Sequence, residues 1–261
     1  MSAAAAGVEL PSDAAEIIDR FQLKGHVEGG YFARTFESDH ILPGNVLPSG
    51  FSCDRPSSTS ILFMLVEGQI SHLHKIKSDE GWHHYAGDPL LVIECCPEGS
   101  AAPVCCTALG HPLSTVSGLG TEKCTANFAK PTDSTGIITR CTPQYFVRSN
   151  RWFGAKLPAG SRWALVGCTV APGFYFAEFQ LADSQGIHDA VMCGVQERLA
   201  EGAPPCHPEQ HPPGPSGVAA SSAWVGSQDA AVAIVQSILP PIPAETACED
   251  AAVSRGEPCA P

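Results

Sequence analysis

Short apolar or alternating runs, separated by glycine, proline and aspartate, dominate the chain from about residue 30 to residue 181. Runs of this kind predict β-strands. Seven or more strands without intervening helices indicate an all-β sandwich or barrel. The strands are expected at residues 60–66, 71–76, 82–85, 90–95, 145–147, 163–170 and 174–181, with another near 104–109.

One helix is expected before the strands. Ala14, Ile17, Ile18 and Phe21 have helical spacing and follow an N-cap candidate, Ser12 or Asp13. The pattern therefore predicts a short helix over 13–21, after a flexible N-terminus at 1–12.

Composition changes along the chain and suggests its organisation. Residues 97–143 are rich in Ser, Thr, Gly and Ala, which indicates a variable surface insertion within a domain over 13–185. Residues 201–217 read EGAPPCHPEQHPPGPSG, a composition typical of a linker. We expect the tail at 186–261 to be mostly disordered, with a short helix at 229–239.

Charge narrows the function classes. The net charge is −12, and 15 Lys and Arg residues form no dense basic patch, so nucleic-acid binding is not expected. No apolar run approaches the ~18 residues that suggest a membrane-spanning helix. Early acidic residues argue against a transit peptide, so the sequence predicts a cytoplasmic protein whose twelve cysteines are reduced.

The most informative run is GQISHLHKIKSDEGWHHYAG at 68–87. His72 and His74 are two residues apart on a predicted strand, so their side chains are expected on one face. Glu80 follows near the turn. Two histidines and a carboxylate can hold a divalent metal with open positions, so one hypothesis is a metal site of His72, His74 and Glu80.

A second reading of the same run needs no metal. Burial would raise the pKa of Glu80 and favour an acid/base pair with His74 as the base. Tyr31 or Tyr85 could then donate a proton. The plainer alternative is that His74 and Glu80 only satisfy each other's hydrogen bonds.

Other candidates surround this run. Trp82 and Trp152 are either core aromatics or a stacking surface for a ligand, with Trp82 the better candidate. Arg34 pairs either with Glu28 or with an anionic ligand group.

Neighbouring residues on a strand point to opposite faces, so His83 and His84 cannot both face inward. Strict alternation from Glu80 favours His84.

The spacing of His72, His74, Glu80 and Gly87 resembles the first motif of the cupin superfamily. The second motif of that superfamily would place a histidine within residues 146–153, but this segment contains no histidine. Taken together, several segments resemble the cupin-5 family, also called the domain of unknown function 985. These segments are GHVEGGYF at 25–32 with Arg34, STSILF at 58–63, SHLHKIKSDE at 71–80, WH at 82–83, GDPL at 87–90, WFGA at 152–155 and VGCTVAPGF at 166–174.

The resemblance covers about residues 13–181 and implies a double-stranded β-helix, the jelly-roll cupin barrel, similar to sugar-nucleotide epimerases and often a homodimer. It favours His83 over His84 as the inward residue. It implies no particular reaction.

Three hypotheses for function follow. The leading one is a small-molecule cupin acting as an epimerase or isomerase on a sugar or keto-acid-like ligand by acid/base chemistry. The alternatives are a non-catalytic small-molecule binding protein and a metal-dependent dioxygenase.

Overall fold

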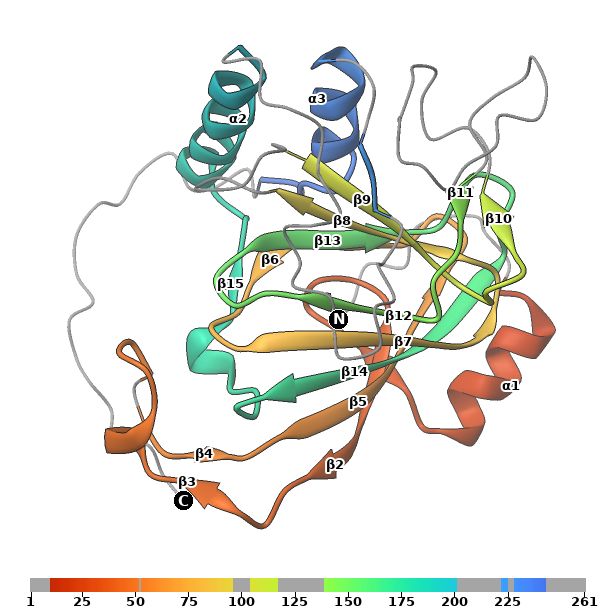
Figure 1. The fold of residues 1–261 in the computed structure, drawn as a ribbon. Coiled ribbons are helices and arrows are strands. Elements are labelled where there is room, and N and C mark those ends of the chain that lie inside the picture. Colours follow the sequence, from red (N-terminus) through yellow and green to blue (C-terminus); the bar gives the residue numbers. More distant parts are fainter. Residues whose placement is uncertain are drawn as a thin grey trace.

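The computed structural model describes residues 10–51, 53–95, 104–116, 139–200, 222–224 and 228–242. Two six-stranded antiparallel sheets form the two layers of a barrel (Figure 1). The first has the order β1 (Lys24–Gly25), β2 (Tyr31–Glu37), β5 (Thr59–Val66), β14 (Trp163–Ala171), β7 (Asp79–Gly87) and β12 (Gln144–Val147). The second has the order β15 (Gln180–Leu181), β6 (Ile70–Lys75), β13 (Trp152–Lys156), β8 (Leu90–Cys95), β9 (Val104–Leu109) and β16 (Ser222–Trp224).

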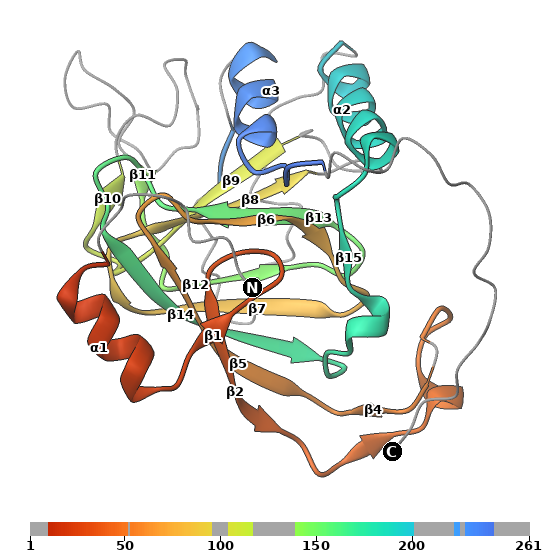
Figure 2. The ribbon, with the colours of Figure 1, turned by 180° about the vertical axis from the view of Figure 1, so that it is seen from behind.

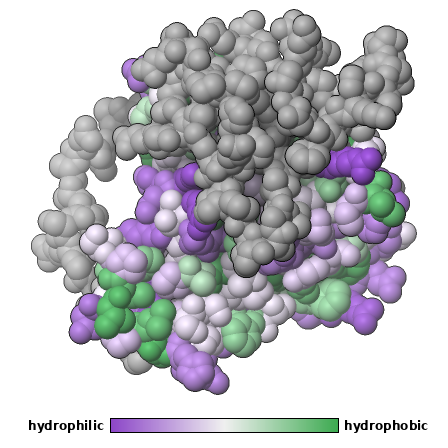
Figure 3. Space-filling view, in the orientation of Figure 1, coloured by the Kyte–Doolittle hydropathy of each residue, from purple (hydrophilic) through white to green (hydrophobic). Residues whose placement is uncertain are grey.

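Smaller elements flank the two sheets. Two short strand pairs are β3 (Ile41–Leu42) with β4 (Arg55–Pro56), and β10 (Thr115–Val116) with β11 (Thr139–Arg140). Two 3-10 turns, η1 (Gly44–Val46) and η2 (Phe176–Glu178), lie in connecting segments. On the face shown in Figure 3, hydrophobic residues gather at the lower left, where Figure 1 shows the β3–β4 arm, and Ile41 and Val46 of this arm are exposed.

Alternation along β5 separates side chains that face the barrel interior from those that face outward. On β5, Phe63 and Leu65 point inward, where they join the apolar cluster between the sheets. Their neighbours Met64 and Val66 point outward and pack beneath helix α1 (Ser12–Arg20). Because successive side chains of a strand alternate between faces, one apolar run supplies two separate cores.

Two further helices cover the outer face of the second sheet, as the two opposite views in Figures 1 and 2 show. These are α2 (Gln185–Ala200) and α3 (Gln228–Gln236). Val191 and Val195 of α2 and Val235 of α3 are buried in the same cluster as Leu73 and Ile93 of the sheet. In the part of the chain that the structure describes, every helix is too short or too polar to span a membrane.

The jelly-roll fold predicted from the sequence is confirmed, and most strands lie within a residue or two of the expected ranges, except that β7 starts three residues early. The strand predicted over 174–181 is wrong, because this segment forms η2 and only the last two residues pair as β15. Beyond residue 185 the sequence predicted one helix, at 229–239, whereas the structure has α2 and β16 as well as α3. Most of the 97–143 insertion and of the N-terminus lies outside the described residues.

Candidate functional site

A cavity of about 50 Å³ lies inside the barrel, between the two sheets and the segment 174–179. Both titratable and aromatic side chains line it. Its lining residues are His26, Glu28, Phe32, Arg34, Thr59, Ile61, His74, Ile76, Glu80, Cys168, Val170, Phe174, Phe176 and Phe179.

Glu28 enters the cavity from the turn between β1 and β2. Gly29 follows it with φ +104°, and a Cβ on Gly29 would lie 2.1 Å from the carbonyl oxygen of Ile70. Only glycine tolerates both this backbone conformation and this approach. The turn can therefore lie against β6, where the backbone N–H of His72 donates to the carbonyl of Glu28 at 2.7 Å.

The buried Glu28 carboxylate has three partners. The Ser71 hydroxyl donates to its Oε1 at 2.9 Å. Its Oε2 lies 3.3 Å from Nδ1 of His26 and 3.5 Å from Nε2 of His74. Burial raises the pKa of Glu28, but the charge of His74 and the hydrogen bond from His26 outweigh it and hold this pKa below its usual value. Glu28 is therefore ionised at neutral pH.

A β-bulge in β6 decides which histidine reaches the cavity. His74 pairs with Phe153 and Ser71 with Ala155, so Gly154 of β13 faces two residues of β6, His72 and Leu73. The extra residue shifts the alternation. As a result, Ser71 and His74 face inward although they are three residues apart.

His72 is turned away from the cavity, with Nδ1 lying 3.4 Å from the carbonyl oxygen of Ile238 beyond α3. The prediction that His72 and His74 share a face is wrong, since it assumed unbroken alternation along this strand. Among the described residues, no group of three or more His, Cys, Asp and Glu side chains has an arrangement that could hold a metal ion. His72, His74 and Glu80 therefore do not fit the divalent metal that the sequence suggested.

Glu80 and Cys168 lie on the neighbouring strands β7 and β14 and face the same cavity. Burial, together with the nearby negative charge of Glu28, raises the pKa of Glu80 to about 8, although a hydrogen bond with Cys168 opposes this rise. Burial also raises the pKa of the Cys168 thiol well above its usual value. At neutral pH the cavity therefore holds a protonated Glu80, a neutral thiol and an ionised Glu28.

The aromatic wall of the cavity comes from the segment 174–179. The ring of Phe176 stacks on His26, with centroids 6.0 Å apart, and that of Phe179 stacks on His74 at 5.4 Å. The adjacent residue Glu178 forms a buried ion pair with Arg55. This wall explains why the segment leaves the sheet: its phenylalanines pack on the imidazoles and do not alternate as strand residues.

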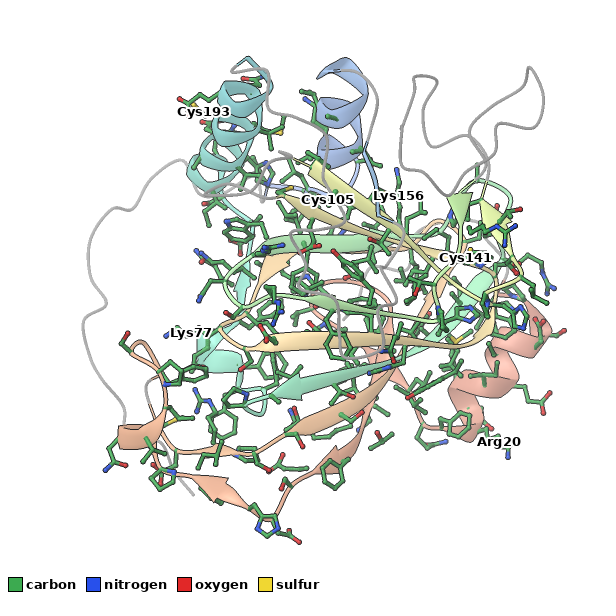
Figure 4. All side chains as sticks on the ribbon, in the orientation of Figure 1. Arg20, Lys77, Cys105, Cys141, Lys156 and Cys193 are labelled. Carbon is green, nitrogen blue, oxygen red and sulfur yellow. The ribbon has the colours of Figure 1, made fainter. Side chains whose placement is uncertain are left out.

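Further contacts fix this wall to its neighbours. The guanidinium of Arg55 lies over the ring of Tyr175 at 4.3 Å. Lys77, labelled in Figure 4, lies 3.9 Å from Glu178 and donates to the carbonyl oxygen of Gly50. The segment is thus held by ion pairs and cation–π contacts instead of strand pairing.

Arg34 lies at the cavity, as the sequence suggested, and about a third of its side chain is exposed. Its guanidinium pairs with the half-exposed Glu37, three residues further along β2. It does not pair with Glu28, which was one of the two partners considered. The other partner, an anionic ligand group, is taken up below.

The remaining predicted residues lie outside the cavity wall. Trp82 is buried in the barrel core, where its ring meets Phe63 and Phe153 edge to face. Trp152 packs on the outer cluster, and Nζ of Lys75 lies 4.7 Å from its ring. Neither tryptophan forms the stacking wall that was considered for them.

Neither candidate tyrosine reaches the cavity. Tyr31 packs in the cluster beneath α1, and Tyr85 is largely exposed, with its ring over Gly167. His83 contacts the half-exposed ring of Phe146 on the outer face. Nε2 of His84 lies 3.1 Å from the carbonyl oxygen of Asp88. Neither histidine lines the cavity, but His84 pairs with Val166 of the inner cluster and so faces inward, as strict alternation from Glu80 predicted.

Sequence reasoning missed His26, Ser71 and Cys168 and did not identify Glu28 as the central carboxylate. One signal was present, since His26 and Glu28 stand two apart directly before two glycines. Nothing in the local pattern distinguishes Cys168 from the other buried cysteines.

Residues 15–182 match the family described as Cupin superfamily (DUF985), which covers more than half of the chain. The chain belongs to this family. No curated protein matches it.

Two solved structures are similar over most of their own length. A protein from Shewanella oneidensis is 27% identical, with a TM-score of 0.50 over 72% of this chain and 92% of that chain. A hypothetical protein from Leishmania major is 24% identical, with a TM-score of 0.52 over 72% of this chain and 97% of that chain. The second likeness shows the fold alone.

Proposed function

We propose that this chain is a small-molecule enzyme of the isomerase or epimerase type, which moves a proton at a carbon next to a carbonyl group. One observation carries the proposal. Two carboxyl groups, Glu28 and Glu80, line one cavity, and their pKa values are displaced in opposite directions. Paired groups of this kind are the usual arrangement of a general acid and a general base.

The roles follow from the protonation states. Neutral Glu80 donates its proton to the carbonyl oxygen of the ligand, and ionised Glu28 accepts the proton from the neighbouring carbon. Glu28 then gives its proton to the former carbonyl carbon, and the hydroxyl on the neighbouring carbon returns a proton to Glu80, which completes an isomerisation and restores both groups. A positioned acid or base contributes roughly 10²–10⁴-fold to such a rate.

His74 takes a different role from the base that the sequence suggested. Its Nδ1 lies 2.7 Å from the carbonyl oxygen of His72, a group that only accepts hydrogen bonds, so Nδ1 donates there. Its Nε2 faces Glu28. His74 is therefore a positioning residue that fixes and stabilises the Glu28 carboxylate.

Solvent deuterium exchange tests the proposal. Small oxo and hydroxy compounds, sugars included, are incubated with the protein in D2O, and deuterium incorporation is followed by NMR. We expect enzyme-dependent exchange that falls at least about 100-fold in Glu80→Gln and Glu28→Gln. His83→Ala, on the outer face, is the control and keeps the wild-type rate. Exchange that persists in Glu80→Gln contradicts the proposal.

A second candidate function is a non-catalytic binding protein. It is favoured by the partners of Glu28, since Ser71, His26 and His74 already satisfy its carboxylate. The same compounds distinguish the two, because a binding protein holds a ligand without exchanging its protons. The metal-dependent dioxygenase is not proposed, since His72 is turned away from the cavity.

The cytoplasmic location and the homodimer stay predictions from the sequence. Size-exclusion chromatography with light scattering measures the oligomeric state directly, and a homodimer should have twice the mass of the 27.3 kDa chain.

A further inference from the structure

We infer that the ligand of this cavity is a small 2-hydroxy or 2-oxo carboxylic acid, whose carboxylate binds Arg34 and whose adjacent oxygen lies between Glu80 and Glu28. The inference rests on the proposed function for the place of the ligand, and it adds the chemical class.

The size of the cavity excludes larger ligands. It encloses about 50 Å³, whereas sites for drug-sized molecules enclose roughly 300–1,000 Å³. A single water needs about 10–15 Å³ of volume measured in this way, so the enclosed part holds roughly three to five water-sized groups. A whole sugar exceeds the enclosed part of the cavity. The rest of a short ligand must lie toward the partly exposed side chains of Arg34 and Phe176.

Charge places an anionic group at Arg34. Among the described lining residues it is the only arginine or lysine. Deeper in the cavity, His26 and His74 already pair with the carboxylate of Glu28 and are not free to bind a second one, so an anion is favoured at Arg34. A guanidinium holds a carboxylate through two parallel hydrogen bonds, which also fixes its orientation.

The present partner of Arg34 can be exchanged at little cost. Glu37 is half-exposed on the same strand, and exposed ion pairs of this kind contribute little to stability because water screens them. A ligand carboxylate can therefore replace Glu37. Removal of the Glu37 charge should consequently strengthen ligand binding.

The two carboxyl groups define the second group of the ligand. Protonated Glu80 donates a hydrogen bond, and ionised Glu28 accepts one. A hydroxyl group on the ligand satisfies both, and an oxo group satisfies Glu80. Since the enclosed volume leaves room for few atoms, this oxygen lies on the carbon next to the carboxylate.

Ligand-observed NMR titration at fixed ionic strength tests the class with L-lactate, pyruvate, propionate, 1,2-propanediol and D-ribose as probes. We expect L-lactate and pyruvate to bind at least tenfold more tightly than the other three. Arg34→Gln should weaken L-lactate at least tenfold and change 1,2-propanediol less than twofold. Glu37→Gln should strengthen L-lactate severalfold.

Two controls locate the binding. Arg162 forms an exposed ion pair with Asp13 and does not line the cavity, so Arg162→Gln should leave every affinity unchanged. L-Lactate should slow alkylation of Cys168, which lines the cavity. It should not slow alkylation of Cys106, which is buried in the outer cluster.

Three results overturn the inference: D-ribose or 1,2-propanediol binds as tightly as L-lactate, Arg34→Gln keeps the wild-type affinity for L-lactate, or none of the probes binds. These outcomes are separable from failure of the proposed function. Selective, Arg34-dependent binding without deuterium exchange contradicts only the proton transfer. Glu80-dependent exchange of a sugar, independent of Arg34, contradicts only the ligand class.

Discussion

Replacement of Glu80 by glutamine should change how the stability of the protein depends on pH. The pKa of Glu80 is raised from 4.5 to about 8 by burial and by the charge of Glu28. The folded protein therefore binds this proton more tightly than the unfolded chain does. The stability that results is fully present below about pH 4.5 and is lost as the pH rises through about 8.

The size of this loss of stability follows from the shift in the pKa of Glu80. One pKa unit corresponds to about 1.4 kcal/mol, so between pH 5 and pH 8 the wild-type protein should lose roughly 3–4 kcal/mol through this group. Glutamine has nearly the same shape and does not ionise, so Glu80→Gln lacks this loss. The variant should be close to wild type at pH 5 and the more stable of the two above pH 8.

Urea unfolding at half-unit steps from pH 5 to pH 9 measures the effect as a difference between two free energies of unfolding. Glu37→Gln, at a half-exposed carboxylate, serves as the matched control and should follow the wild-type curve. Parallel curves for wild type and Glu80→Gln across this range would refute a buried, neutral Glu80.

Three other substitutions or truncations test the supports of the site. Gly29→Ala should destabilise the protein by at least about 2 kcal/mol in urea unfolding, because Gly29 has a positive φ and lies against β6. Gly186→Ala in α2 is the control and should not destabilise the protein, since a Cβ there meets open space. Equal effects of the two substitutions would contradict the close approach of Gly29 to β6. Arg55→Met removes the buried guanidinium partner of Glu178 and leaves the half-exposed Lys77 at 3.9 Å, which should cost as much as about 3–5 kcal/mol. The double variant Arg55→Met with Glu178→Leu should recover most of this loss, and no recovery would argue against the pair. Truncation after residue 184 removes α2 and α3 and should expose the apolar outer face of the second sheet. Increased binding of a hydrophobic dye measures this exposure. Unchanged dye binding would contradict the packing of the two helices on the sheet.

Much of the barrel could be predicted from the sequence, because strand periodicity is a local property. Residues 90–95 and 104–109 match β8 and β9, and the inward and outward sets of β5 follow from simple alternation. The helix α2 carries a weaker signal. Ile187, Val191 and Val195 recur every four residues, but the helix contains two glycines, and its stability depends on packing against the sheet.

The site was less predictable, because its geometry depends on non-local contacts. His74 and Glu80 were identified and do line the cavity. His72 was misplaced because a bulge depends on pairing with β13, which the sequence of β6 alone does not reveal. The network around Glu28 requires the turn at Gly29 to meet β6, more than 40 residues away, and periodicity carries no information on such a contact.

The central claim is that one cavity holds a protonated carboxyl group beside an ionised one. Carbon-13 NMR of protein labelled at the glutamate side-chain carboxyls measures it directly through a pH titration, with Glu80→Gln and Glu28→Gln used to assign the two signals. We predict that Glu80 titrates near 8 and Glu28 below its usual range. Titration of both carboxyls together near 4.5 would contradict the account.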